Sequence, residues 1–149
     1  MMLHNIPTNY NGVLYPSKAE AKYAEFLDSQ VKQGKVKWWK RQVRFQVEGN
    51  KRYTVIADFL VMGEREEIHE VKRGYYSQEF IYKSQLWLEQ YPSFTYLVVE
   101  PTAIGWTYTP LEEFIKPYLV SQPVSQPQHF NKLEIFLAKI VHTIGGYFR

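Results

Sequence analysis

The chain has 149 residues, of which 45% are hydrophobic, 22% charged and 17% aromatic. This is typical of one globular domain and too apolar for a disordered chain. There are no cysteines, which excludes disulfides, thiolate catalysis and cysteine-ligated zinc. No apolar run approaches the roughly 20 residues that span a bilayer, and the first ten residues do not resemble a secretory signal. We therefore expect a cytoplasmic protein with no membrane partner.

The net charge of +3 is unevenly distributed. Residues 32–52 contain eight basic residues and one acidic residue, a local charge of +7, so the rest of the chain sums to −4. A local excess of this kind is typical of a surface that binds a polyanion. A solvated strand with its turns is the other interpretation of this segment.

The first predicted elements are an N-terminal arm and a helix. Residues 1–16 are mostly polar and rich in helix and strand breakers, which indicates an arm that leads into the domain. Ser17 with Glu20 three residues later has capping-box spacing, and Gly34 is a helix stop. This predicts a helix over residues 18–33, with an apolar stripe of Tyr23, Ala24, Leu27 and Val31.

Three strands should follow the helix. They are predicted at residues 36–47, 53–62 and 67–73, joined by short turns at 48–51 and 63–66. The middle strand carries apolar residues on both faces, which is typical of a central strand. Adjacent Trp38 and Trp39 must face opposite ways, so we expect one of them to lie in the core.

The remaining pattern predicts a helix at residues 77–90, a strand at 94–99 and a short helix at 111–118. A doublet of Ser-Gln-Pro within residues 120–128 is linker-like, and residues 131–144 fit a final amphipathic helix. The expected fold is α/β with a mixed sheet, in the order α-β-β-β-α-β plus a C-terminal helical extension. We divide the chain into a core with its arm at 1–119 and a linker with a helix at 120–149.

Three acidic residues occupy positions where the pattern calls for apolar ones. Asp58 shares a strand face with Ile56 and Leu60, and Glu70 shares its face with Lys72. Glu20 lies on the apolar stripe of the first helix, whereas Glu25 should face solvent. An unpaired charge in a core is very costly, so such groups are paired or bind metal.

Each of these residues also has a purely structural interpretation. Glu20 could serve only as a helix cap, and Glu70 with Lys72 could be an exposed pair at a strand end. Asp58 is harder to explain in this way because its flanking residues are predicted to be buried. Together, two carboxylates and a lysine suit phosphodiester hydrolysis, in which Mg²⁺ bound by carboxylate oxygens activates water and neutralises the transition state.

The spacing of these residues resembles the PD-(D/E)XK nuclease superfamily. Asp58 is followed by Glu70-Val71-Lys72 after eleven intervening residues, although Ala57 replaces the nominal proline. The Ser-x-x-Glu start of the first helix is similar to that of the phage endonuclease I-like and transposase-subunit-like branches. The resemblance covers residues 15–100, and Gln42 and Lys83 also match positions of those branches.

The resemblance implies a restriction-endonuclease-like core and a DNA endonuclease that depends on Mg²⁺, with Mn²⁺ as a substitute. It implies that Asp58, Glu70 and the carbonyl of Val71 hold the metal, while Glu20 and Lys72 complete the catalytic set. Because cleavage of both strands usually needs two active sites, we expect a homodimer. Gln78-x-x-x-Tyr82 also resembles a motif of the exonuclease-like branch, and the alternative is that Gln78 and Tyr82 are surface residues of a helix.

Basic residues on and after the strands are the candidates for contacts with DNA phosphates. They are Lys37, Lys40, Arg41, Arg44, Arg73 and Lys83. His69 should face away from Glu70 and is interpreted as structural. Two other classes of function stay open: a catalytically inactive nucleic-acid-binding module on the same fold, and an architectural protein that uses the basic strand alone.

Overall fold

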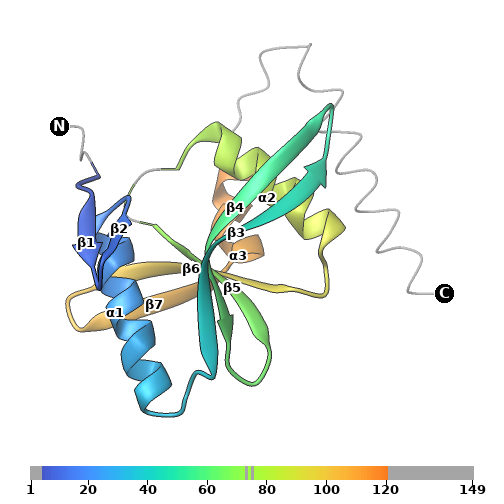
Figure 1. Cartoon of the computed structure of the whole chain (residues 1–149). Coiled ribbons are helices and arrows are strands. Elements are labelled where there is room, and N and C mark those ends of the chain that lie inside the picture. The colour runs from blue at the N-terminus through green and yellow to red at the C-terminus, as the bar shows by residue number, and fades with distance from the viewer. Residues whose placement is uncertain (1–4, 73, 75, 121–149) are drawn as a thin grey trace. The chain divides into compact units, whose positions relative to one another are not determined.

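The computed structural model describes residues 5–72, 74 and 76–120 (Figure 1). A five-stranded sheet has the order β3-β4-β5-β6-β7, in which only β5 and β6 are parallel neighbours. The predicted mixed α/β class is confirmed, and the order α-β-β-β-α-β is present from α1 to β6. The elements are β1 (Thr8–Tyr10), β2 (Val13–Tyr15), α1 (Lys18–Lys32), β3 (Trp38–Glu48), β4 (Arg52–Met62), β5 (Glu66–Val71), α2 (Gln78–Gln90), β6 (Thr95–Thr102), β7 (Gly105–Pro110) and α3 (Leu111–Val120).

The N-terminal arm contains a hairpin that was not predicted from the sequence. β1 and β2 form an antiparallel hairpin whose turn residues, Asn11 and Gly12, both have positive φ, at 49° and 78°. Asn-Gly favours this turn because both residues tolerate the left-handed conformation. The hydroxyl of Tyr10 donates a hydrogen bond to Asp28 of α1 at 2.8 Å. The hairpin is thereby attached to the first helix.

Helix α1 begins as predicted and buries a slightly different face. The Ser17 hydroxyl accepts a hydrogen bond from the backbone N–H of Glu20 at 3.1 Å, which confirms the N-cap. Val31, which was assigned to the apolar stripe, is 37% exposed. From Asp28 to Lys32 every residue is half-buried or exposed, so the buried residues of α1 all lie between Glu20 and Leu27. The buried face consists of Glu20, Ala21, Tyr23, Ala24 and Leu27.

The long β3–β4 hairpin leaves the rest of the sheet at Asp58. β4 pairs with β5 only from Phe59 to Met62, whereas it pairs with β3 along its whole length. The far end of the hairpin lies beside α2 (Figure 1). There the amide of Gln90 accepts from the N–H of Glu48 and donates to its carbonyl, both at 2.8 Å. β4 is therefore central, as predicted, but its second face is only partly covered: Ile56 is exposed.

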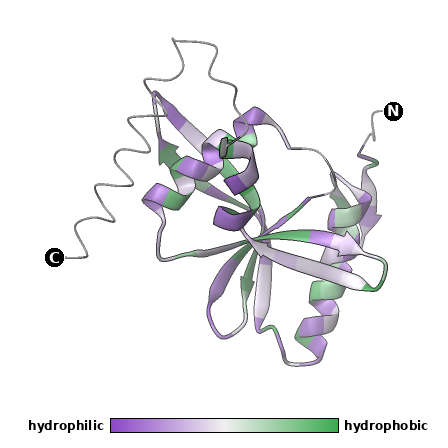
Figure 2. Cartoon of the chain, turned by 180° about the vertical axis from the view of Figure 1, so that it is seen from behind, coloured by the Kyte–Doolittle hydropathy of each residue, from purple (hydrophilic) through white to green (hydrophobic). Residues whose placement is uncertain are grey.

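Two sets of buried residues fill the space on either side of the sheet. Below α1 lie Tyr15, Tyr23, Leu27, Phe59, Val61, Val71 and Val99. Below α2, the ring of Trp87 packs edge-on against Tyr96 with centroids 4.8 Å apart. Hydrophobic and hydrophilic stretches alternate along α1 (Figure 2), as the amphipathic pattern requires.

The last part of the described chain was only partly predicted. β6 continues to Thr102 and is followed by β7, a strand that the pattern did not reveal. The short helix α3 begins at Leu111 as expected. The predicted linker beyond Val120 and the predicted helix at residues 131–144 lie outside the described residues. Within the described part of the chain, no helix is both long and apolar enough to cross a membrane.

Candidate active site

The site forms where β4 and β5 separate. The backbone pairing of β4 with β5 ends at Phe59 and His69. Beyond this pair, side-chain carboxylates accept the hydrogen bonds of the backbone N–H groups. The N–H of Val71 donates to Asp58 Oδ2 at 2.9 Å, and the N–H of Asp58 donates to Glu70 Oε2 at 3.3 Å. Each carboxylate is thus fixed to the strand that carries the other. The antiparallel register of β4 and β5 brings Asp58 and Glu70 together, although eleven residues lie between them in the sequence.

Glu70 is buried, with 6% of its surface exposed, so the interpretation as an exposed charge pair was wrong. Lys72 Nζ lies 2.8 Å from Oε1, and the hydroxyl of Tyr96 donates to Oε2 at 3.2 Å. Lys72 Nζ also lies 4.3 Å from the ring centroid of Phe80 on α2. Its ammonium is therefore held between a carboxylate and the negative face of an aromatic ring.

Glu20 is both a capping residue and a buried acid beside this pair. Its Oε1 accepts from the Ser17 hydroxyl at 3.0 Å, and only 8% of its surface is exposed. Burial raises the pKa of Glu20, the Ser17 hydrogen bond lowers it, and the charges of Glu70 and Lys72 act on it with opposite signs. The structure therefore brings Glu20 into the same electrostatic cluster as Glu70 and Lys72.

Asp58 has the most perturbed environment of these carboxylates. Burial raises its pKa well above the usual range, and the negative charges of Glu70 and Glu20 raise it further. The Val71 hydrogen bond and Lys72 act in the opposite direction but do not prevail. Lys72 contacts the cluster and Arg41 acts on Glu20 as a second positive charge, so three carboxylates keep an excess of negative charge that a proton or a cation would relieve.

The donor set suits a hard divalent cation such as Mg²⁺, which prefers oxygen ligands and keeps several waters. Asp58 and Glu70 supply carboxylate oxygens, and Val71 between Glu70 and Lys72 has a backbone carbonyl. Among the described residues, no three His, Asp or Glu side chains are arranged to hold an ion together. In this conformation Glu70 instead faces Lys72 and Tyr96, so metal binding requires Glu70 to exchange partners.

Gln42 lies across the hairpin from Asp58 in a strained conformation. Its neighbours Arg41 and Val43 pair with Phe59 and Ala57, which places Gln42 opposite Asp58 in the register. Its φ is 53°, a left-handed value that is uncommon for residues other than glycine and is concentrated at functional sites. Gln42 was noted in the sequence only for its resemblance to a family position.

Two of the six predicted DNA-contacting residues lie on the same face as Asp58. Lys40 and Arg44 are exposed and pair in the register with Leu60 and Ile56, the residues two positions to either side of Asp58. Side chains at such positions share a face. Lys40 and Arg44 therefore flank the site on the open side of the hairpin.

The other predicted contacts are placed differently. Arg41 points toward β2, where its guanidinium lies 4.8 Å from the Tyr15 ring centroid. Lys83 pairs with Glu79 on α2 at 2.7 Å. Lys37 is exposed just before β3, and Arg73 lies outside the described residues.

His69 and Trp39 belong to the other side of the sheet. His69 faces α1, where Tyr23 Oη lies 2.8 Å from its Nδ1, and burial lowers its pKa. Trp39 packs against Phe59 and donates to Asp28 at 2.9 Å, so it is the inward-facing tryptophan of the pair. Gln78 and Tyr82 lie on α2; the hydroxyl of Tyr82 is 3.4 Å from Asn50 at the hairpin tip.

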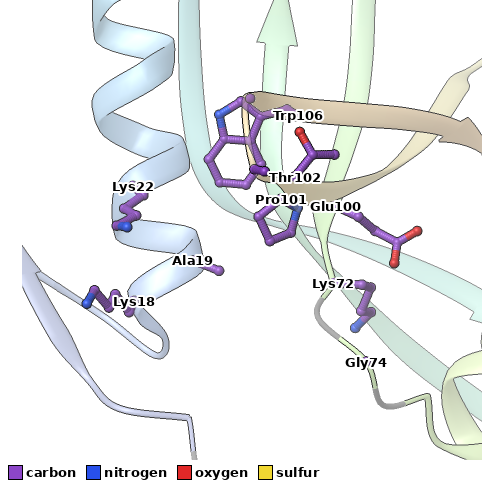
Figure 3. A pocket seen from close by; sticks show the side chains of 11 residues that line it. Lys18, Ala19, Lys22, Lys72, Gly74, Glu100, Pro101, Thr102 and Trp106 are labelled. Atoms are coloured by element: carbon purple, nitrogen blue, oxygen red, sulfur yellow. The ribbon is translucent and has the colours of Figure 1, made fainter.

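A pocket beside Lys72 was not anticipated. It has a volume of about 590 Å³ and lies between the start of α1 and the β6–β7 turn (Figure 3). Exposed lysines on a helix are ordinary, and only the fold brings α1 opposite β6 and β7. The lining residues include Lys18, Lys22, Lys72, Glu100, Pro101 and Trp106.

No family model, no curated protein and no solved structure matches this chain.

Proposed function

We propose that this protein is a metal-dependent DNA endonuclease of the PD-(D/E)XK superfamily, with Asp58, Glu70 and Lys72 at its centre and Glu20 as the fourth member. One observation carries the proposal: Asp58 and Glu70 are fixed together where two strands separate, in a cluster of one half-buried and two buried carboxylates that the neighbouring cations do not fully neutralise. Such a cluster destabilises the fold unless a proton or a bound cation neutralises it, and clusters of this kind are concentrated at functional sites.

The reaction forms a bond between a water oxygen and phosphorus and breaks the bond between phosphorus and a deoxyribose oxygen. Mg²⁺ held by Asp58, Glu70 and the Val71 carbonyl would supply charge neutralisation and an acidified water, and Mn²⁺ could replace it. The chain's own groups hold and orient the reactants. Glu20 would help to hold the metal, directly or through water, since it belongs to the same charge cluster.

Lys72 has two successive roles in this scheme. Without metal, its ammonium neutralises Glu70 at 2.8 Å. Once Glu70 is engaged elsewhere, the ammonium is released, and the Phe80 ring keeps it at the site. There it can donate to the attacking water or to a phosphate oxygen, stabilising the charge that develops in the transition state.

Lys40 and Arg44 would bind phosphates of the DNA that approaches Asp58. The expected homodimer follows from cleavage of both strands and belongs to the proposal. The alternative, an inactive nucleic-acid-binding module, is disfavoured because Glu20, Asp58, Glu70 and Lys72 are all present and clustered.

The test is incubation of the full chain with supercoiled and branched DNA, in Mg²⁺ or in EDTA. We expect cleavage that is lost on chelation and in Asp58→Asn. Glu20→Gln and Glu25→Gln are a matched pair on α1, since Glu25 is exposed; only Glu20→Gln should lower cleavage. DNA binding without cleavage in any form or metal would overturn the enzyme and favour the inactive module.

A further inference from the structure

The pocket beside Lys72 is a second recognition element. One wall is the first two turns of α1, and the other is the β6–β7 turn from Glu100 to Trp106 (Figure 3). Its volume of about 590 Å³ falls within the roughly 300–1,000 Å³ of pockets that hold small ligands. Because Lys72 lines it and also touches Glu70, the pocket opens directly beside the proposed active site.

The charge of the pocket favours an anion. Lys18 and Lys22 are exposed and form no ion pair among the described residues. The acidic group in the lining, Glu100, already accepts a hydrogen bond from Tyr76 at 3.1 Å. The two lysines do not help the helix: they lie near its N-terminus, where the helix dipole disfavours cations, and like charges four residues apart repel. Binding of an anionic ligand would explain these two lysines, whereas stabilisation of the helix does not.

The far wall carries an aromatic ring that is packed in place. The indole of Trp106 packs edge-on against Tyr23, with centroids 4.8 Å apart at 72°, and Pro101 lies beside it (Figure 3). An aromatic ring that lies across a pocket from lysines combines the two features that bind single-stranded nucleic acid, in which bases stack on rings and phosphates meet cations.

We propose that this pocket holds an unpaired nucleotide of the DNA strand next to the scissile phosphate, with its phosphate between Lys18 and Lys22 and its base against Trp106. The inference rests on the proposed nuclease function and names its substrate class. A base inside a duplex cannot enter a pocket without leaving its partner. The preferred substrate is therefore DNA with an unpaired nucleotide beside the cut, as in a flap or a fork.

The test compares binding of a labelled duplex and of the same duplex with a short single-stranded flap, measured by fluorescence anisotropy without divalent metal. We expect the wild type to bind the flap DNA about tenfold more tightly, as one stacked base allows. Lys18→Gln/Lys22→Gln should abolish this preference and reduce the slope of log Kd against log salt by between one and two. Lys116→Gln, an exposed lysine on α3, removes a charge elsewhere and should change neither.

A second readout reports on the base itself. The adenine analogue 2-aminopurine, placed at the first flap position, should be quenched on binding to the wild type and to Trp106→Phe. Trp106→Leu should lose the quenching. Lys18→Gln/Lys22→Gln changes only exposed side chains, so its melting temperature should equal that of the wild type. Free deoxynucleotide monophosphate should compete only at much higher concentration.

The outcomes separate this inference from the proposed function. Flap preference that depends on Lys18 and Lys22, in a protein that cuts nothing, supports the pocket and overturns the nuclease. Cleavage that is equal on duplex and flap DNA, and unchanged in Lys18→Gln/Lys22→Gln, supports the nuclease and overturns the pocket. Tight binding of the free mononucleotide, with no preference for a flap, also overturns it.

Discussion

Replacing Asp58 with asparagine should stabilise the protein at neutral pH in the absence of metal. An asparagine oxygen can still accept the hydrogen bond that Val71 donates at 2.9 Å, while one negative charge leaves a cluster of three carboxylates. Stabilising substitutions at such sites typically contribute about 0.5–2 kcal/mol. For a chain of this length, each kcal/mol raises Tm by about 2–4 °C, so we expect an increase of a few degrees in thermal unfolding.

The pH dependence of this gain has a defined sign. The folded-state pKa of Asp58 is raised above that of the unfolded chain, which is about 3.9. Below that value Asp58 is protonated in both states and costs nothing; as the pH rises through the folded-state pKa, the charged carboxylate destabilises the fold. The Tm of Asp58→Asn should therefore equal that of the wild type near pH 4 and exceed it at pH 7.

Mg²⁺ should reverse the order of the melting temperatures of the wild type and Asp58→Asn. Mg²⁺ at about one hundred times its Kd stabilises a folded protein by about 2.7 kcal/mol, and only the wild type retains both carboxylates. Glu25→Gln, which removes an exposed charge, should show neither effect. If Asp58→Asn melts below the wild type at pH 7 without metal, Asp58 is a structural acceptor and the reasoning about its charge is refuted.

Three further outcomes are expected. Cleavage should increase with pH through an apparent pKa above the usual carboxylate range, since Asp58 must be deprotonated to bind metal; a profile that is flat from pH 5 to 8 would contradict this. Glu20→Gln should lower kcat by about tenfold or more while Glu25→Gln leaves it unchanged, and equal activities would reduce Glu20 to a helix cap. In urea unfolding, Gln42→Gly should be more stable than Gln42→Ala by about 1 kcal/mol, because glycine tolerates a φ of 53°; the reverse order would mean that this strand residue is not strained.

Local signals in the sequence account for most of the fold. The Ser17 cap, the Gly34 stop and the apolar alternation of β4 act over a few residues, and each predicted its element. The β1–β2 hairpin was missed because its strands have three residues each, although Asn11-Gly12 was a usable turn signal. β7 has mostly exposed residues, so it lacks the apolar alternation by which strands are recognised.

Some residues of the candidate site could likewise be predicted from local sequence signals, and others could not. Asp58 and Glu20 could be found because a charge interrupts an apolar pattern, which is visible in one strand or one helix. The hydrogen bond that the Tyr96 hydroxyl donates to Glu70 could not be predicted, because it depends on the parallel register of β5 and β6. The lysine pocket depends on the placement of α1 against β7, which no short pattern encodes.

The separation of β4 from β5 offers a structural explanation for the acidic cluster, and that explanation is insufficient. Where the ladder stops, the N–H groups of Asp58 and Val71 need acceptors, and the two carboxylates supply them. Asparagine and glutamine would supply the same oxygens without burying charge. The third acid, Glu20, already has its capping partner in Ser17 and adds only repulsion to the other two. The hydrogen bonds therefore explain the positions of these side chains but not their charges, and a bound cation explains both.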